Sequence, residues 1–125
     1  NIDEVKELYL YKHSNLKNRL LFITSTDKDP YAAFIKENNP INNFEKIRTL
    51  VEKGYIIRTR TDYDTVQARG NDHTQKQFAF NSGAQLISTD YIEANFKFSN
   101  YTVKFANNDT LRINPITKDI AKCKL

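Results

Sequence analysis

The sequence predicts an α/β fold, namely part of a (β/α)8 barrel. Segments of strand length, rich in β-branched and aromatic residues, alternate with amphipathic segments of helix length, as in parallel βαβ units. A complete barrel takes about 250 residues, so this chain of 125 residues fits the C-terminal half. We expect residues 1–125 to form a single domain with about three parallel strands, crossover helices and a terminal antiparallel β-hairpin.

The first third of the chain predicts a helix, a strand and a loop. Residues 1–13 carry apolar side chains at helical spacing and form an amphipathic helix. Residues 19–25 are a nearly unbroken apolar run, which indicates a strand covered on both faces. Residues 29–38, "DPYAAFIKEN", follow as a polar loop that includes a short helix.

The middle of the chain predicts a helix and then a strand that carries arginines. Asn42 or Asn43 caps the helix and Gly54 ends it. Its apolar stripe consists of Phe44, Ile47, Leu50 and Val51. The strand follows within "GYIIRTRTDYDT", residues 54–65.

The last part of the chain predicts a helix, a strand and the hairpin. The helix starts at Asn71 or Asp72 and ends at Gly83. The next strand lies in residues 84–91, "AQLISTDY". In residues 101–113, "YTVKFANNDTLRI", two alternating apolar runs flank an Asn-Asn-Asp turn and predict the hairpin.

The strand at residues 55–62 places charged side chains on one face. Because side chains alternate along a strand, Arg58, Arg60 and Asp62 point the same way. If that face meets solvent, the charges are ordinary surface decoration. If helices cover both faces, as the βαβ pattern favours, each arginine needs a carboxylate or an anionic ligand, because an unpaired buried charge is costly.

Polar residues follow each predicted strand at its carboxyl end. In open α/β sheets and in barrels, ligands bind at the carboxyl ends of the strands. A binding site is therefore expected where these residues meet: Thr24, Ser25, Arg60, Thr61, Asp62, Ser88, Thr89 and Asp90.

Composition limits the classes of function only loosely. The net charge is +4, but the charged residues are scattered and favour an anionic partner only weakly. The single cysteine, Cys123, offers neither a disulfide within the chain nor a cysteine metal cluster. No apolar run is long enough to cross a membrane. Asn100 and Asn108 begin glycosylation sequons, which chance explains equally well in an Asn-rich chain.

Several motifs together resemble one family of phosphodiesterases. The motifs are "GYIIRTRTDYDTVQAR", "ND.T", "SGAQLISTDY", "HSNLKNRLLF", "AAFIKENNP" and "RINP", which span almost the whole chain. They are similar to the C-terminal half of the calcium-dependent phosphoinositide phospholipase C family, which has a TIM-barrel fold. The resemblance implies cleavage of the phosphodiester of an inositol phospholipid, with Ca2+, by attack of the inositol 2-hydroxyl on phosphorus, as in a phosphoric diester hydrolase or lyase.

The resemblance also implies that this chain is incomplete as a catalyst. The general acid and base histidines and most calcium ligands of the family lie in the N-terminal half of the barrel, so the chain alone should be inactive. His13 and His73 match no catalytic position of the family, and we expect them to be surface or capping residues. No complete catalytic set is therefore assigned here.

The resemblance places candidate substrate-binding residues on the strand that carries arginines and on the one after it. Arg60 is the first candidate for the phosphate, because a guanidinium suits two phosphate oxygens. Arg58 lies deeper and should pair with a carboxylate, either Asp62 or Asp90. The substrate-binding set is Arg58, Arg60, Asp62, Ser88 and Asp90, and the residues that orient it are Asp64, Thr65, Arg69 and Asp72.

A structural role remains the alternative for each of these groups. Arg58 and Arg60 could belong to an ion-pair network inside the barrel, and Arg69 and Asp72 could be a helix cap and a surface pair.

The expected partners are those of the family. They are a phosphoinositide head group or another phosphodiester, a transiently bound membrane surface, and the N-terminal half of the barrel; the resemblance implies a secreted or cell-envelope protein. Two alternatives stay open. One is a catalytically inactive module that binds an anion or nucleic acid, although burial of the sheet under helices disfavours nucleic acid. The other is an interaction module that dimerises through its open strand edges.

Overall fold

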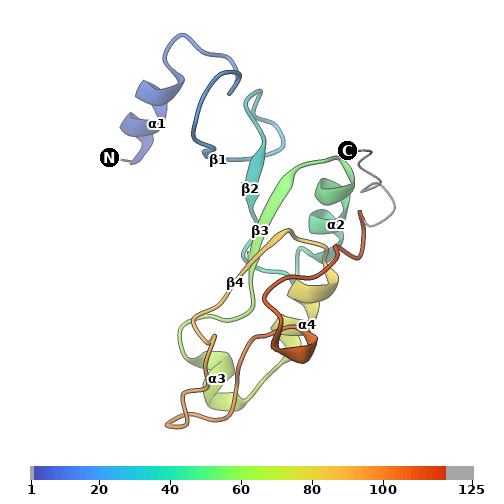
Figure 1. Cartoon of the computed structure of the whole chain (residues 1–125). Coiled ribbons are helices and arrows are strands. Elements are labelled where there is room, and N and C mark those ends of the chain that lie inside the picture. The colour runs from blue at the N-terminus through green and yellow to red at the C-terminus, as the bar shows by residue number, and fades with distance from the viewer. Residues whose placement is uncertain (1, 118–125) are drawn as a thin grey trace.

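The computed structural model describes residues 2–117, and its elements follow one another as in Figure 1. The helices are α1 (Ile2–Leu10), α2 (Phe44–Glu52), α3 (Val66–Gly70) and α4 (Thr74–Asn81). The strands are β1 (Thr24–Ser25), β2 (Phe34–Lys36), β3 (Ile56–Arg60) and β4 (Leu86–Ser88), and a 3-10 turn, η1, spans Ala106–Asn108. Cys123, for which we predict no disulfide within the chain, lies outside the described residues.

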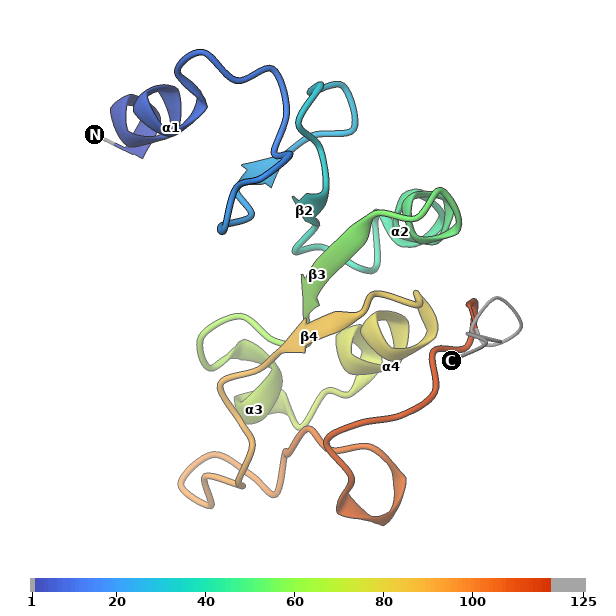
Figure 2. The ribbon, with the colours of Figure 1, turned by 45° about the horizontal axis from the view of Figure 1, so that its top comes forward.

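The four strands form one parallel sheet in sequence order, β1-β2-β3-β4. In Figure 2, the strands β2, β3 and β4 lie side by side, with α2 and α4 beside them. Lys36 pairs in register with Arg58, and Arg60 with Ser88. The predicted α/β fold is confirmed, because parallel strands alternate with helices as in part of a (β/α)8 barrel.

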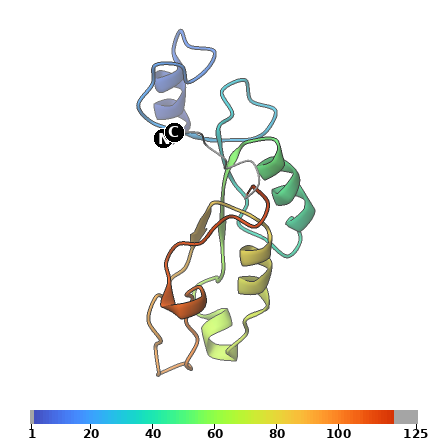
Figure 3. The same ribbon diagram turned by 45° about the vertical axis from the view of Figure 1, so that its right-hand side comes forward.

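One face of the sheet is packed under helices. Ile57 is fully buried and Ile35 is nearly so. Both lie in one core cluster with the side chains that α2 buries, namely Ile47, Leu50 and Val51. The apolar stripe predicted for α2 is therefore confirmed, and Gly54, with a φ of +90°, follows its end. Figure 3 shows α2 and α4 on the same side of the sheet.

The opposite face is not covered by helices among the described residues. Along β3 the burial alternates, with Ile57 and Thr59 buried and Ile56, Arg58 and Arg60 half-buried. The expectation that helices cover both faces is therefore wrong for residues 2–117. The geometry is that of a barrel wall, in which the helices pack outside and the inner face lines the barrel interior.

Two predictions for the first third of the chain are corrected. Residues 34–36 form strand β2 and not part of a loop with a short helix, because they pair with β3: the Ile56 amide donates to the Ala33 carbonyl at 2.9 Å, and Ile35 enters the core. The predicted strand at residues 19–25 shrinks to Thr24–Ser25. Its apolar residues before β1 have little cover, with exposed fractions of 98%, 65% and 62% for Leu20, Leu21 and Phe22.

Two further predictions for the second half are corrected. The expected helix over residues 71–83 is shorter, α4, and a separate short helix, α3, occupies part of the expected loop. The terminal antiparallel hairpin is not seen, because the structure assigns no strand within residues 101–113. Instead the Val103 amide donates to the Tyr91 carbonyl at 2.9 Å, and Asn107 and Asn108 adopt positive φ in a turn. Here packing of the segment against its neighbours outweighs its alternating pattern.

Candidate functional site

The carboxyl ends of β2, β3 and β4 lie at the same edge of the sheet, because the strands are parallel. We call the residues gathered there the strand-end cluster, and it consists of Asn38, Arg58, Arg60, Tyr63 and Asp90. The contacts within the cluster join residues from the ends of three strands. Such an edge is where ligands bind in α/β proteins.

Arg60 is held on two sides within the strand-end cluster. Its Nη2 donates to Asp90 Oδ2 at 3.3 Å, and its guanidinium carbon lies 4.8 Å from the centre of the Tyr63 ring. The Asp90 side chain is 59% exposed, whereas that of Arg60 is 22% exposed. Arg60 Nε is buried and lacks a hydrogen-bond partner among the described residues. Arg60 therefore retains an unused donor, and the exposed ion pair that engages it is weak.

Arg58 pairs with a neutral amide and not with a carboxylate, contrary to the prediction. Its Nη1 donates to Asn38 Oδ1 at 2.7 Å. Asn38 is also held by Tyr63, whose hydroxyl donates to the Asn38 carbonyl at 2.7 Å. The charge of Arg58 is therefore not neutralised by an ion pair within residues 2–117. The carboxylate that reaches an arginine is Asp90, and its partner is Arg60.

Asp62 and Ser88 connect the strand ends. Asp62 is fully buried, so it does not share the half-open face of Arg58 and Arg60 that strict alternation predicts. Its carboxylate accepts hydrogen bonds from the Thr61 and Thr89 hydroxyls and from the Asp90 amide. The Ser88 hydroxyl donates to the Thr59 carbonyl at 3.2 Å.

The four residues predicted to orient the site lie on the loop and helices after β3. Asp64 adopts a positive φ of 46°, and its carbonyl accepts from the Tyr91 hydroxyl at 2.8 Å. Thr65 Oγ1 accepts from Arg69 Nε at 2.9 Å, and Arg69 also lies over the Phe98 ring. Asp72 accepts from the Thr74 amide at the start of α4. These contacts bring none of the four to Arg60.

Within residues 2–117, neither histidine hydrogen-bonds or stacks with a member of the strand-end cluster. His13 is exposed beyond α1, and His73 occupies the N-cap position of α4 without a capping hydrogen bond from its side chain. The His73 ring stacks on Tyr101 with 5.0 Å between ring centres. Burial, with nearby Lys76 adding to it, lowers the pKa of His73, and Asp72 opposes the shift.

Tyr101 lies under the strand ends and is fully buried. Its hydroxyl donates to the Thr61 carbonyl at 3.2 Å. Burial, and then the nearby charge of Asp62, raises the pKa of Tyr101 far above its usual value. Tyr101 therefore stays neutral and acts as a hydrogen-bond donor beneath the cluster.

No group of three or more His, Cys, Asp or Glu side chains within residues 2–117 is placed to hold a metal ion. Asp62, a buried carboxylate two residues after Arg60, already accepts three hydrogen bonds. The described side chains therefore do not fit a calcium site by themselves. In the same part of the chain, no helix has the length and apolar character needed to cross a membrane.

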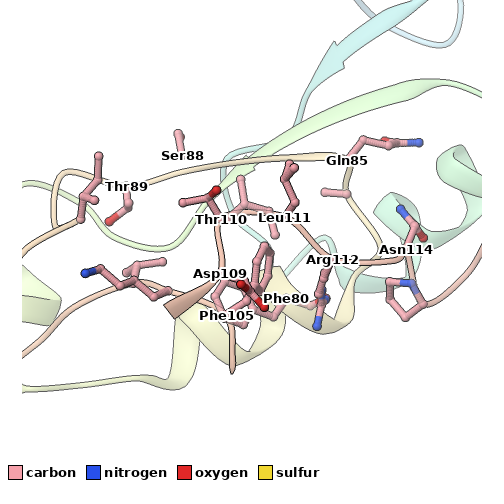
Figure 4. A pocket seen from close by; sticks show the side chains of 16 residues that line it. Phe80, Gln85, Ser88, Thr89, Phe105, Asp109, Thr110, Leu111, Arg112 and Asn114 are labelled. Carbon is pink, nitrogen blue, oxygen red and sulfur yellow. The ribbon is translucent and has the colours of Figure 1, made fainter. Parts of the chain in front are cut away.

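A cavity of about 590 Å³ borders β4, and Arg60 does not line it. Figure 4 shows that its walls come from two segments that run side by side, one with Gln85, Ser88 and Thr89 and the other with Thr110, Leu111 and Arg112. Phe80 and Phe105 also line the cavity, and their ring centres lie 4.6 Å apart. Its lining is mainly apolar, so we assign the polar chemistry to the strand-end cluster and not to this cavity.

Sequence reasoning missed Asn38 and Tyr63. The pattern of residues 29–38 predicts a loop with a short helix and not β2, so it gives no sign that Asn38 follows a strand end. Tyr63 lies inside the stretch "TDYDT", but its contacts with Asn38 and Arg60 are tertiary. An aromatic residue three positions after an arginine in a strand is too common a signal to identify such a pair.

Comparison with known proteins identified one family. Residues 1–115 match the family described as phosphoinositide phospholipase C, Ca2+-dependent. Searches of curated proteins and of solved structures found no significant match.

Proposed function

Because the chain belongs to the Ca2+-dependent phosphoinositide phospholipase C family, we propose that it is the C-terminal part of a barrel that cleaves the phosphodiester of an inositol phospholipid. Its role in that reaction is to bind the phosphate with Arg60. The observation that carries the proposal is the position of Arg60 at the carboxyl end of β3, half-buried, with Nε unpartnered among the described residues.

A phosphate matches what Arg60 offers. A guanidinium presents a planar array of donors that suits two phosphate oxygens, and the attraction increases as water is excluded. Asp90 reaches only Nη2 of Arg60 in this structure, so a phosphate can bind the remaining guanidinium donors while the carboxylate holds Arg60 in place. Ser88 pairs in register with Arg60, Asp90 forms its ion pair, and Arg58 precedes it by two residues on β3, so we propose that these three residues contact the head group.

The proposal assigns the proton transfers to the other half of the barrel. General acid and base groups must lie within hydrogen-bond reach of the protons they transfer, and neither His13 nor His73 lies at the strand-end cluster. Four parallel strands, with β1 and β4 at the edges of the described sheet, leave two edges for an N-terminal half to pair with. The apolar cavity beside β4 adjoins one of these edges.

Calcium is implied by the family, whereas the described side chains do not form a site for it. We assign its main ligands to the N-terminal half, where the bound ion would stabilise negative charge on the phosphate. The residues of this chain contribute by holding the phosphate oxygens. The proposal includes transient contact with a membrane surface, where an inositol phospholipid resides, in a secreted or cell-envelope setting.

A complete barrel provides the test of activity. Release of inositol phosphate from phosphatidylinositol is measured for the protein in which this chain adjoins its N-terminal half, with calcium and with a chelator. We expect calcium-dependent release, at least about a hundredfold lower in Arg60→Ala, and near-normal release in Arg48→Ala, a matched control on α2. Equal release by the two variants would refute the role of Arg60.

The isolated 125-residue chain serves as a second control. We expect no release from it, and its free sheet edges favour pairing with a second copy, which light scattering measures. A complete barrel that releases nothing would instead favour an inactive anion-binding or interaction module.

A further inference from the structure

We infer that Asp62 is a positioning residue that orients Arg60 through the backbone of Asp90. The phosphate ligand in this inference rests on the proposed function, whereas the effect of Asp62 on the position of Arg60 concerns the protein alone. Asp62 is fully buried and so cannot contact a substrate in this structure. It follows β3 within two residues of Arg60, and its contacts reach the end of β4.

The carboxylate of Asp62 accepts three hydrogen bonds. Oδ2 accepts from the Thr61 hydroxyl at 2.6 Å and from the Thr89 hydroxyl at 2.5 Å, and Oδ1 accepts from the Asp90 amide at 3.0 Å. Within residues 2–117 it has no ion-pair partner. A buried charge is tolerated only when it is well hydrogen-bonded. The two donors from Thr89 and Asp90 therefore hold the loop after β4 at a fixed distance from the end of β3.

This connection determines where the Asp90 carboxylate lies. The Asp90 amide points to Asp62, and the Asp90 side chain then reaches Arg60 Nη2 at 3.3 Å. On its other side, Arg60 lies over the Tyr63 ring. A loop freed from Asp62 would release Asp90, and the guanidinium would lose one of its two supports. An arginine that must be ordered during binding has a lower affinity.

Tyr101 lies beside the network of Asp62. It is fully buried, and its hydroxyl donates to the Thr61 carbonyl. A low local dielectric strengthens the hydrogen bonds to the Asp62 carboxylate and raises the cost of removing a donor. Loss of one hydrogen-bond donor to Asp62 should therefore alter the position of Arg60, although that donor does not contact Arg60.

The test follows the Arg60 side chain by NMR in the 125-residue chain. Its Nε–Hε signal is assigned by its loss in Arg60→Lys. Asp62→Asn and Thr89→Val each remove part of the network, whereas Thr89→Ser keeps the hydroxyl. We expect hydrogen exchange at Arg60 Nε to be about tenfold faster in the first two variants, and unchanged in Thr89→Ser. The signal of Arg69, whose Nε bonds to Thr65, is the internal control.

The second measurement is the affinity for inositol 1-phosphate. We expect the dissociation constant to rise about tenfold in Asp62→Asn and Thr89→Val and to recover in Thr89→Ser. Wild-type exchange and wild-type affinity in a folded Thr89→Val or Asp62→Asn chain would overturn the inference, and Thr89→Val decides alone if Asp62→Asn does not fold. Lack of binding by the wild-type chain would count against the proposed function, while the exchange rates would still decide the role of Asp62.

Discussion

The guanidinium carbon of Arg60 lies 4.8 Å from the centre of the Tyr63 ring, while the Tyr63 hydroxyl donates to the Asn38 carbonyl at 2.7 Å. One side chain thus connects the ends of β2 and β3 beneath the proposed phosphate position. The ring and the hydroxyl serve different partners, so they can be tested separately.

Tyr63→Phe keeps the ring under Arg60 and removes only the hydroxyl, whereas Tyr63→Leu removes both. A cation–π contact contributes about 0.5–1 kcal/mol at a partly exposed site. We therefore expect Tyr63→Leu to weaken binding of inositol 1-phosphate by about two- to fivefold, and Tyr63→Phe by less than about twofold. Calorimetric titration measures both. Equal losses in the two variants would show that the hydroxyl, and not the ring, supports Arg60.

The packing of the sheet on one face predicts unequal costs for two neighbouring isoleucines. Ile57 is fully buried in the core formed with α2, and Ile56 is half-buried on the opposite face. Ile57→Ala should lower the free energy of unfolding by about 2–5 kcal/mol, and Ile56→Ala by about 1 kcal/mol or less. Urea denaturation of the isolated chain gives both values. A similar loss in the two variants would mean that both faces are covered in solution.

Gly83 allows a close approach that a side chain would prevent. Its φ is +79°, and an added Cβ would clash with the side chain of Ile116. Gly83→Ala should therefore destabilise the fold by about 2 kcal/mol or more. In Gly70, the matched control at the end of α3, a Cβ would approach no atom closer than 3.9 Å. Gly70→Ala should be neutral or stabilise by up to about 1 kcal/mol. Thermal unfolding midpoints would contradict this account if Gly83→Ala matched the wild type.

The stacked pair His73 and Tyr101 predicts acid sensitivity near neutral pH. Burial lowers the pKa of His73 in the folded chain below the usual 6.5, so the unfolded chain binds the proton more readily. The stability contributed by neutral His73 is thus present above pH 6.5 and declines as the pH falls from there through the lower folded pKa. The facing groups are Tyr101, which stays neutral, Lys76 and Asp72.

Chemical denaturation between pH 7.5 and pH 5 tests this effect. His73→Phe keeps an aromatic ring against Tyr101 but has no proton to bind. Its stability should decline less with falling pH than that of the wild type. Parallel declines in the two proteins would assign the acid sensitivity to other groups.

The sequence was sufficient where local pattern and tertiary packing agree. The stripe of Ile47, Leu50 and Val51 with Gly54 after it predicted α2, and those residues are the ones buried against β3. The sequence pattern did not predict β2, because a strand of three residues acquires its stability from pairing with β3 and not from its own sequence. It failed for the hairpin because Val103 bonds to Tyr91 and not across a turn.

The candidate site was predicted in part for the same reason. Alternation along β3 correctly placed Arg58 and Arg60 on one face. It misplaced Asp62, because β3 ends at Arg60 and the chain turns before Asp62. The contacts from Arg58 to Asn38 and from Arg60 to Tyr63 depend on how loops meet, and no spacing rule predicts them.

The most direct test of the central claim is a titration of the 125-residue chain with inositol 1-phosphate, followed at the Nε–Hε signals of its arginines. The account predicts that Arg60 shows the largest change, that Arg58 follows, and that free inositol causes neither. Arg112, whose guanidinium lies over the rings of Phe80 and Phe105, should not respond. A largest response at Arg112 or Arg69, or an equal response to inositol without phosphate, would contradict the claim that Arg60 binds the phosphate.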